Sequence, residues 1–182
     1  MRSSGSTTKR IATTAVLTAM ALAAQWLESM LPLLIPAVPV RVGIANIFVL
    51  YAMLALSPVE GLLVTVLRTA LLPLITGNVS GMLYGMAGSL LAWGLMFLTS
   101  GLLRKGFVSE IGLSVSGAAG FQVGQCLAGH FVVGRVIWMY FPLMMLLAIP
   151  AGIITGWLCS VLLKRLGISN GPERVTRQEN AE

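Results

Sequence analysis

Long apolar stretches separated by short polar or proline-containing turns constrain this chain more than any other feature. Hydrophobic residues make up 57% of the sequence and charged residues only 10%, whereas soluble domains carry about 25% charged residues. A soluble core could not absorb this much apolar surface in 182 residues. The stretches also lack the two-residue alternation of a membrane β-barrel. We therefore predict an all-α membrane protein. The stretches cover residues 11–35, 42–56, 59–75, 79–98, 111–133 and 136–163.

The positions of the basic residues predict how these six helices are oriented. Cytoplasmic loops of membrane proteins carry an excess of Lys and Arg. With the N-terminus inside, nine of the 12 basic residues lie on the cytoplasmic side, Arg41 and Arg135 lie outside, and Arg68 lies within a helix. We predict a cytoplasmic segment at 1–10, a six-helix transmembrane domain at 11–164 and a mobile cytoplasmic tail at 165–182. This arrangement suits a multi-pass protein of a bacterial cytoplasmic (inner) membrane, with the lipid bilayer as its surroundings. Because the basic residues lie at helix ends, we expect no nucleic-acid partner.

Proline and serine residues predict where several of these helices begin and end. Ser57-Pro58 is a turn signal that separates the second stretch from the third. In the sixth stretch, Pro142 predicts a late helix start and Pro150 a kink.

The first apolar stretch carries two further signals. Ala15, Ala19 and Ala23 recur every four residues, so they share one face of a helix. Such a stripe lets another helix approach closely, either inside the bundle or as a docking face for a partner. Residues 21–23 also resemble a signal-peptidase site after a basic segment. The apolar stretch continues to Ile35, which favours a retained helix over cleavage.

Nearly all strongly polar residues inside the stretches fall in the predicted outer half of the membrane. Ionisable residues at such depth are costly and usually mark functional sites. We expect them to converge on one outward-facing, ligand-binding cavity. The alternative is a set of separate local pairs, such as Glu28 with Arg68 or Arg41, that hold helices together. The predicted ligand-binding residues are Glu28, Arg41, Asn46, Arg68, Gln122 and Gln125.

The charge of this set predicts the charge of its ligand. Arg41 and Arg68 stand against a single acid, Glu28, which leaves one guanidinium without a protein counter-ion. The guanidinium fork suits carboxylate or phosphate. We therefore predict a small amphipathic anion, either a carboxylated cofactor precursor or a phosphorylated isoprenoid-like compound.

Several kinds of chemistry have no residues to carry them. The chain has no aspartate, so it lacks the aspartate-rich motifs that hold Mg²⁺ against a diphosphate. It has no Walker A motif, so any ATP use would belong to a partner. His130, Cys126 and Cys159 lack the spacing of a metal site. We expect no enzymatic activity, no cofactor and no metal.

Three segments resemble a known family. The run at 41–46 (Arg-Val-Gly-Ile-Ala-Asn), the pair Leu67-Arg68 and the segment at 117–125 resemble the Gx transporter family. That family is also filed as heptaprenyl diphosphate synthase component I. Phe121 and Gln122 stand where the family often has a His-Asn pair.

This family is similar to the substrate-binding S components of energy-coupling factor transporters. The resemblance implies a six-helix protein that captures a small molecule from outside. It also implies that the alanine face docks on a transmembrane coupling subunit driven by two ATPases. The second interpretation is a non-catalytic membrane subunit of a heptaprenyl diphosphate synthase assembly. A channel is disfavoured, because no stretch carries a continuous polar stripe.

Overall fold

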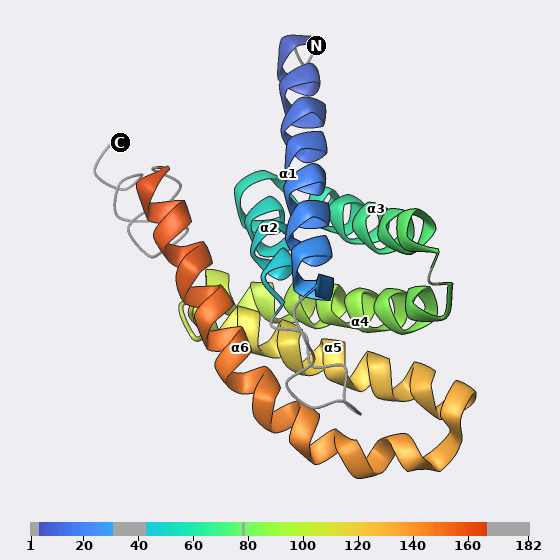
Figure 1. Ribbon diagram of the computed structural model, residues 1–182. Coiled ribbons are helices and arrows are strands. Elements are labelled where there is room, and N and C mark those ends of the chain that lie inside the picture. The colour runs from blue at the N-terminus through green and yellow to red at the C-terminus, as the bar shows by residue number, and fades with distance from the viewer. Residues whose placement is uncertain (1–3, 31–42, 78, 167–182) are drawn as a thin grey trace.

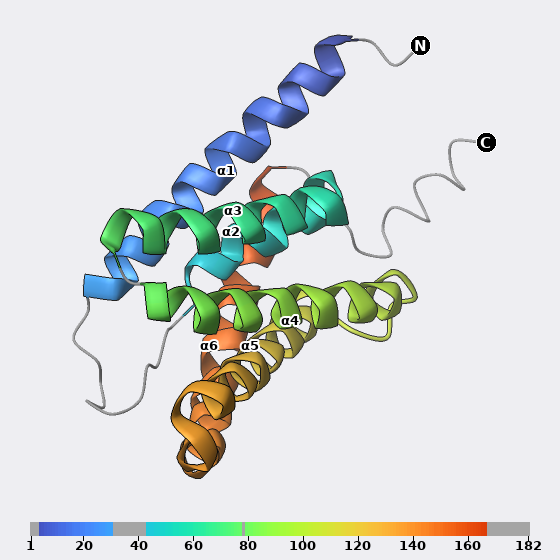
Figure 2. The same ribbon diagram turned by 90° about the vertical axis from the view of Figure 1, so that its right-hand side faces the viewer.

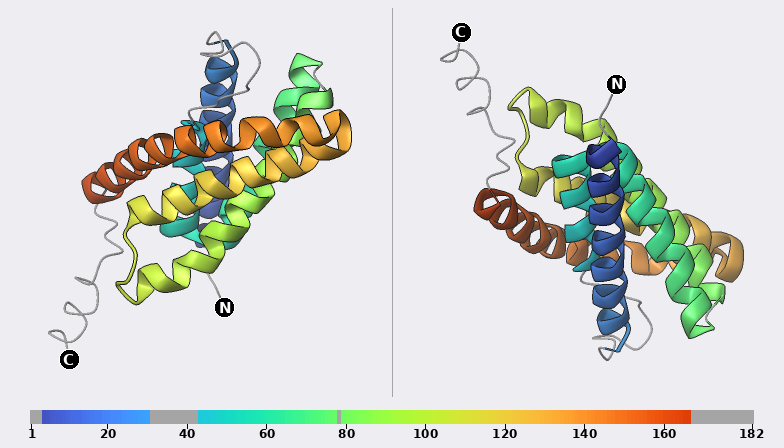
Figure 3. Two further views of the ribbon diagram at one scale, coloured as in Figure 1. Left: turned by 90° about the horizontal axis from the view of Figure 1, so that it is seen from below. Right: turned by 90° about the horizontal axis from the view of Figure 1, so that it is seen from above.

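The computed structural model describes residues 4–30, 43–77 and 79–166, and these are helical apart from short turns, with no strand. The first helix crosses the others steeply, while α5 lies between α4 and α6 (Figures 1 and 3). The main helices are α1 (Ser4–Met30), α2 (Ala45–Tyr51), α3 (Pro58–Thr76), α4 (Val79–Arg104), α5 (Glu110–Val133) and α6 (Ile137–Arg165). Helix α2 continues directly as a short π-helix (Ala52–Leu56), and a 3₁₀ turn (Gly134–Val136) precedes α6.

The helix boundaries follow from local sequence chemistry. Ser57 has an extended backbone, and Pro58 then opens α3 at the position where a missing N–H costs nothing. Gly77 ends α3 in the left-handed region, at φ 71°, which an L side chain rarely adopts. Ser109 caps α5, because its Oγ accepts from the Gly112 N–H at 3.3 Å. The turn signal at Ser57-Pro58 therefore marks the beginning of α3 correctly.

The predicted late start of the sixth helix is wrong. Helix α6 begins at Ile137 and runs unbroken to Arg165, with Pro142 and Pro150 inside it. The preceding 3₁₀ turn already supplies helical backbone before Pro142, so the proline does not have to open the helix. Helix α1 begins at Ser4, within the predicted segment 1–10, and the division of the chain into cytoplasmic and transmembrane segments stays a prediction.

Four helices in the described part of the chain are long and apolar enough to cross a membrane. They comprise Thr7–Met30, Pro58–Thr76, Gly81–Leu103 and Gly134–Arg165. The apolar helix at Ala45–Leu56 is shorter. At about 1.5 Å per residue it reaches only roughly 18 Å, against about 30 Å of hydrocarbon. Helix α5 has sufficient length, but its glycine, serine and glutamine residues make it less apolar than the four. A multi-pass membrane protein is thus supported, while six spans and cytoplasmic termini stay predictions.

Small residues set how closely α4, α5 and α6 approach. A Cβ on Gly124 would lie 2.5 Å from the Ala87 carbonyl oxygen, and one on Gly156 would lie 2.7 Å from the Ile111 Cα. Backbone contacts of this kind need glycine. A Cβ built on Gly85 would have nothing within 4 Å, so only some of the glycines allow helices to approach closely.

The N-terminal end of α1 extends beyond the other helices, whereas the rest of the helix lies against α3 and α2 (Figures 1 and 2). Leu17 and Ala21 pack there in a core that includes Leu50, Met53 and Val64 from α2, the π-helix and α3. Trp93 of α4 donates from Nε1 to the Pro58 carbonyl at 3.0 Å. Together these contacts hold the ends of α1 and α2 against α3 and α4, which positions the site described next.

Candidate functional site

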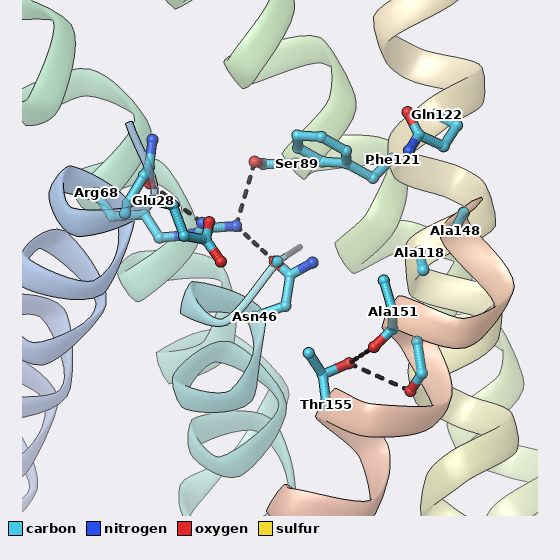
Figure 4. A pocket seen from close by; sticks show the side chains of 13 residues that line it. Glu28, Asn46, Arg68, Ser89, Ala118, Phe121, Gln122, Ala148, Ala151 and Thr155 are labelled. Carbon is cyan, nitrogen blue, oxygen red and sulfur yellow. Dashed lines mark hydrogen bonds between the residues drawn. The ribbon is translucent and has the colours of Figure 1, made fainter. Parts of the chain in front are cut away.

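A buried arginine joins four helices at the centre of the molecule. Arg68 lies midway along α3, and only 5% of its surface is exposed. Its Nη1 donates to Gln25 Oε1 of α1 at 3.2 Å. Its Nη2 donates to Asn46 Oδ1 of α2 at 2.8 Å and to Ser89 Oγ of α4 at 3.3 Å (Figure 4). All three of these acceptors are neutral oxygens, and the three bonds hold the guanidinium in place.

Glu28 supplies the negative charge of the same region. Its Oε1 accepts the backbone N–H of Ile44, the residue that precedes α2. A helix N-terminus has backbone donors without intrahelical partners, and a carboxylate there interacts favourably with them. Glu28 therefore ties the end of α1 to the beginning of α2, next to Asn46.

These side chains line one cavity between α1, α2 and α3 on one side and α5 and α6 on the other (Figure 4). Its volume is about 30 Å³, which is space for two or three water molecules at about 10–15 Å³ each. Its polar lining consists of Gln25, Glu28, Asn46, Arg68, Ser89, Gln122 and Thr155.

Two glutamines on α5 differ in their relation to this cavity. Gln122 and Gln125 are both 4% exposed, and the Oε1 atom of each lacks a hydrogen-bond partner among the described residues. Gln122 lines the cavity, whereas Gln125 does not. An unpartnered buried acceptor costs about 1–3 kcal/mol, and Gln122 carries one in the wall of the cavity.

The structure thus brings together Glu28, Asn46, Arg68 and Gln122, four of the predicted ligand-binding residues. Gln125 lies outside the cavity lining, and Arg41 lies outside the described residues. Ligand binding by this set stays a prediction. Gln25 and Ser89 also line the cavity, and neither was among the predicted ligand-binding residues.

Gln25 precedes Glu28 by three residues, so it shares its helix face, and that spacing could have identified it. A lone serine in a glycine-rich helix, as Ser89 is, carries no comparable signal.

The predicted docking face of α1 is exposed. Ala15, Ala19 and Ala23 all lie on the outer side of the helix, while Ala21 and Gln25 are buried. Beside Ala15, a groove of about 610 Å³ runs between α1 and α3. Leu63 and Leu67 line it, as do Arg10 and Glu60, which form an ion pair between Nη2 and Oε1 at 2.5 Å. The stripe is therefore available to a neighbouring helix, and its role as a docking face stays a prediction.

The described part of the chain contains no group of three or more His, Cys, Asp or Glu side chains that could hold a metal ion. The residues that gather here are arginine, amides, hydroxyls and one carboxylate, which recognise a polar ligand through charge and hydrogen bonds.

Comparison with known proteins finds no similar protein with curated annotation and no similar solved structure. A protein family described as heptaprenyl diphosphate synthase component I matches residues 17–162. The match covers most of the chain and includes every described residue of the cavity. The chain therefore belongs to the heptaprenyl diphosphate synthase component I family.

Proposed function

We propose that this protein captures a small molecule with an anionic group from the outer side of a bacterial cytoplasmic membrane. The observation that carries the proposal is the buried Arg68 guanidinium, which lines a polar cavity and is held there by three neutral acceptors. The four helices that are long and apolar enough to cross a membrane support a membrane location.

The energetic argument starts from the cost of the buried charge. An arginine near the middle of a transmembrane helix costs about 2.5–3.5 kcal/mol on insertion scales. Hydrogen bonds to neutral oxygens offset part of this cost. A carboxylate or phosphate that reaches the guanidinium fork would offset more, because charge-assisted hydrogen bonds are about twice as strong as neutral ones. An anionic group is thus the ligand chemistry that this site favours most.

The outer side follows from the proposed orientation. The segments at 1–10 and 164–182 together carry seven of the 12 basic residues, and the positive-inside rule assigns such ends to the cytoplasm. Glu28, Asn46 and Arg68 then lie in the outer half of the membrane or near its middle. The cavity would accordingly open towards the outside.

A transporter S component also needs a partner that couples binding to transport. The exposed face formed by Ala15, Ala19 and Ala23 supports docking on a transmembrane coupling subunit. Two ATPases would drive such a subunit, since the chain has no Walker A motif of its own.

The second candidate is a non-catalytic membrane subunit of a heptaprenyl diphosphate synthase assembly. The description of the family favours it. This candidate predicts co-purification with a soluble prenyltransferase, and it requires no ligand at Arg68.

Thermal unfolding of the detergent-purified protein tests the first candidate. The probes are anionic and cationic vitamins, and the matched variants are Arg68→Lys at the cavity and Arg135→Lys on the exposed α5–α6 turn. We expect stabilisation by anions in the parent and in Arg135→Lys. In Arg68→Lys we expect binding at least about tenfold weaker, because lysine keeps the charge and loses the fork. Stabilisation by cations alone, or full binding by Arg68→Ala, would contradict the proposal.

A further inference from the structure

The cavity holds opposite charges as well as an unsatisfied acceptor. Arg68 and Glu28 approach it from α3 and α1, and Gln122 approaches from α5 on the other side (Figure 4). The described lining therefore contains one positive and one negative side chain. A ligand that carried only negative charge would complement one of them and be repelled by the other.

Gln122 favours a ligand that also donates a hydrogen bond. Its Oε1 is buried and has no partner among the described residues, and its side chain lines the cavity. A pure acceptor such as a bare carboxylate or phosphate leaves this oxygen unsatisfied. A ligand with an N–H or O–H on the side away from Arg68 satisfies it.

The size of the cavity limits the ligand further. Ala118, Ala148, Ala151 and Gly152 form its wall on α5 and α6, and the volume is about 30 Å³. Cofactor-sized ligands occupy pockets about ten times larger or more. A compact ligand needs only small shifts of the side chains around it, whereas a prenyl chain or a fused-ring cofactor requires the helices to separate.

We propose that the ligand is a small zwitterion of the amino-acid class. Its carboxylate binds the Arg68 guanidinium, its ammonium group lies against the Glu28 carboxylate, and Gln122 Oε1 accepts an N–H or O–H from the ligand. This inference rests on the proposed function and narrows the ligand from anions in general to molecules that carry both charges and a donor.

The test uses probes that differ in one charged group. Each standard amino acid is added to the purified full-length protein in detergent, and stabilisation is measured by thermal unfolding and affinity by calorimetry. The best amino acid is compared with the amine that lacks its carboxylate and the hydroxy acid that lacks its ammonium. For serine these are ethanolamine and glycerate. We expect the amino acid to bind at least about tenfold more tightly than either the amine or the hydroxy acid.

Two variants with one control connect this preference to the cavity. Glu28→Gln keeps an oxygen for the Ile44 N–H and removes the charge. It should therefore weaken binding of the amino acid about tenfold, whereas binding of the hydroxy acid should stay the same or become tighter, because the repulsion is gone. Gln122→Leu should also weaken the amino acid. Gln125→Leu removes an equally buried amide whose Oε1 also has no partner among the described residues. Gln125 does not line the cavity, so affinity should be unchanged.

The outcomes separate this inference from the proposed function. Tight binding of the hydroxy acid without a preference for the amino acid overturns the zwitterion and leaves anion capture standing. Stabilisation by the amine alone overturns both. Failure of every standard amino acid to stabilise the protein overturns the zwitterion, and the anionic vitamins then decide the proposed function separately.

Discussion

The hydrogen bond between Arg68 and Asn46 should couple the stabilities of α2 and α3. The perturbation is a double-mutant cycle of Arg68→Met and Asn46→Ala. The change in unfolding free energy caused by Arg68→Met alone combines two opposing effects. The substitution removes three stabilising hydrogen bonds, and it also removes the cost of a buried charge. The cycle cancels the charge term and isolates the pair.

The magnitude follows from the geometry. Side-chain hydrogen bonds between transmembrane helices contribute about 0.6 kcal/mol on average and up to about 1.7 kcal/mol. The bond from Nη2 to Asn46 is 2.8 Å long and has a charged donor, so we expect a coupling of about 1–1.7 kcal/mol. The bond from the same Nη2 to Ser89 is 3.3 Å long. The cycle with Ser89→Ala should therefore give a smaller coupling, about 0.6 kcal/mol or less.

The assay is equilibrium unfolding in mixed micelles as the fraction of a denaturing detergent rises. The control cycle pairs Asn46→Ala with Arg135→Met, because Arg135 is exposed and shares no hydrogen bond with Asn46 among the described residues. That control should be additive within about 0.5 kcal/mol. Additivity of Arg68→Met with Asn46→Ala within the same limit would refute the argument that this bond joins the two helices.

Three further predictions concern the surface and the packing. Ala19→Trp, on the exposed face of α1, should leave folding and ligand stabilisation intact and reduce co-purification of a coupling partner, whereas Ala21→Trp in the core should unfold the protein, as circular dichroism would show. Equal unfolding by both would mean that the alanine face packs internally. Gly124→Ala should lower thermal stability because its Cβ meets the α4 backbone, and Gly85→Ala, with open space around it, should be neutral or stabilising in the same melt. Cysteine labelling at Ser169 should find the C-terminus cytoplasmic, and external labelling there would exclude six spans.

Properties that depend on neighbours along the chain were predictable from the sequence. The membrane class, the helical content and the boundaries of α3 follow from apolar stretches, Pro58 and Gly77. The places of Arg68, Gln122 and Gln125 inside apolar stretches are also visible without any structure, whereas the buried Gln25 and Ser89 were missed. The length of α2 was not predictable to the same degree, because its apolar stretch extends into residues 42–44, before the helix begins.

The composition of the cavity was decided only by the tertiary structure. Whether a polar residue reaches the cavity depends on the rotation of its helix and on the angle at which helices cross. Gln122 and Gln125 look alike in the sequence, and only the first lines the cavity. Ser89 joins Arg68 because α4 packs beside α3. Backbone contacts such as that between Gly124 and Ala87 set those rotations. Such contacts join residues that are far apart in the chain. Hydropathy and charge patterns describe only neighbouring residues along the chain, so they do not predict these contacts.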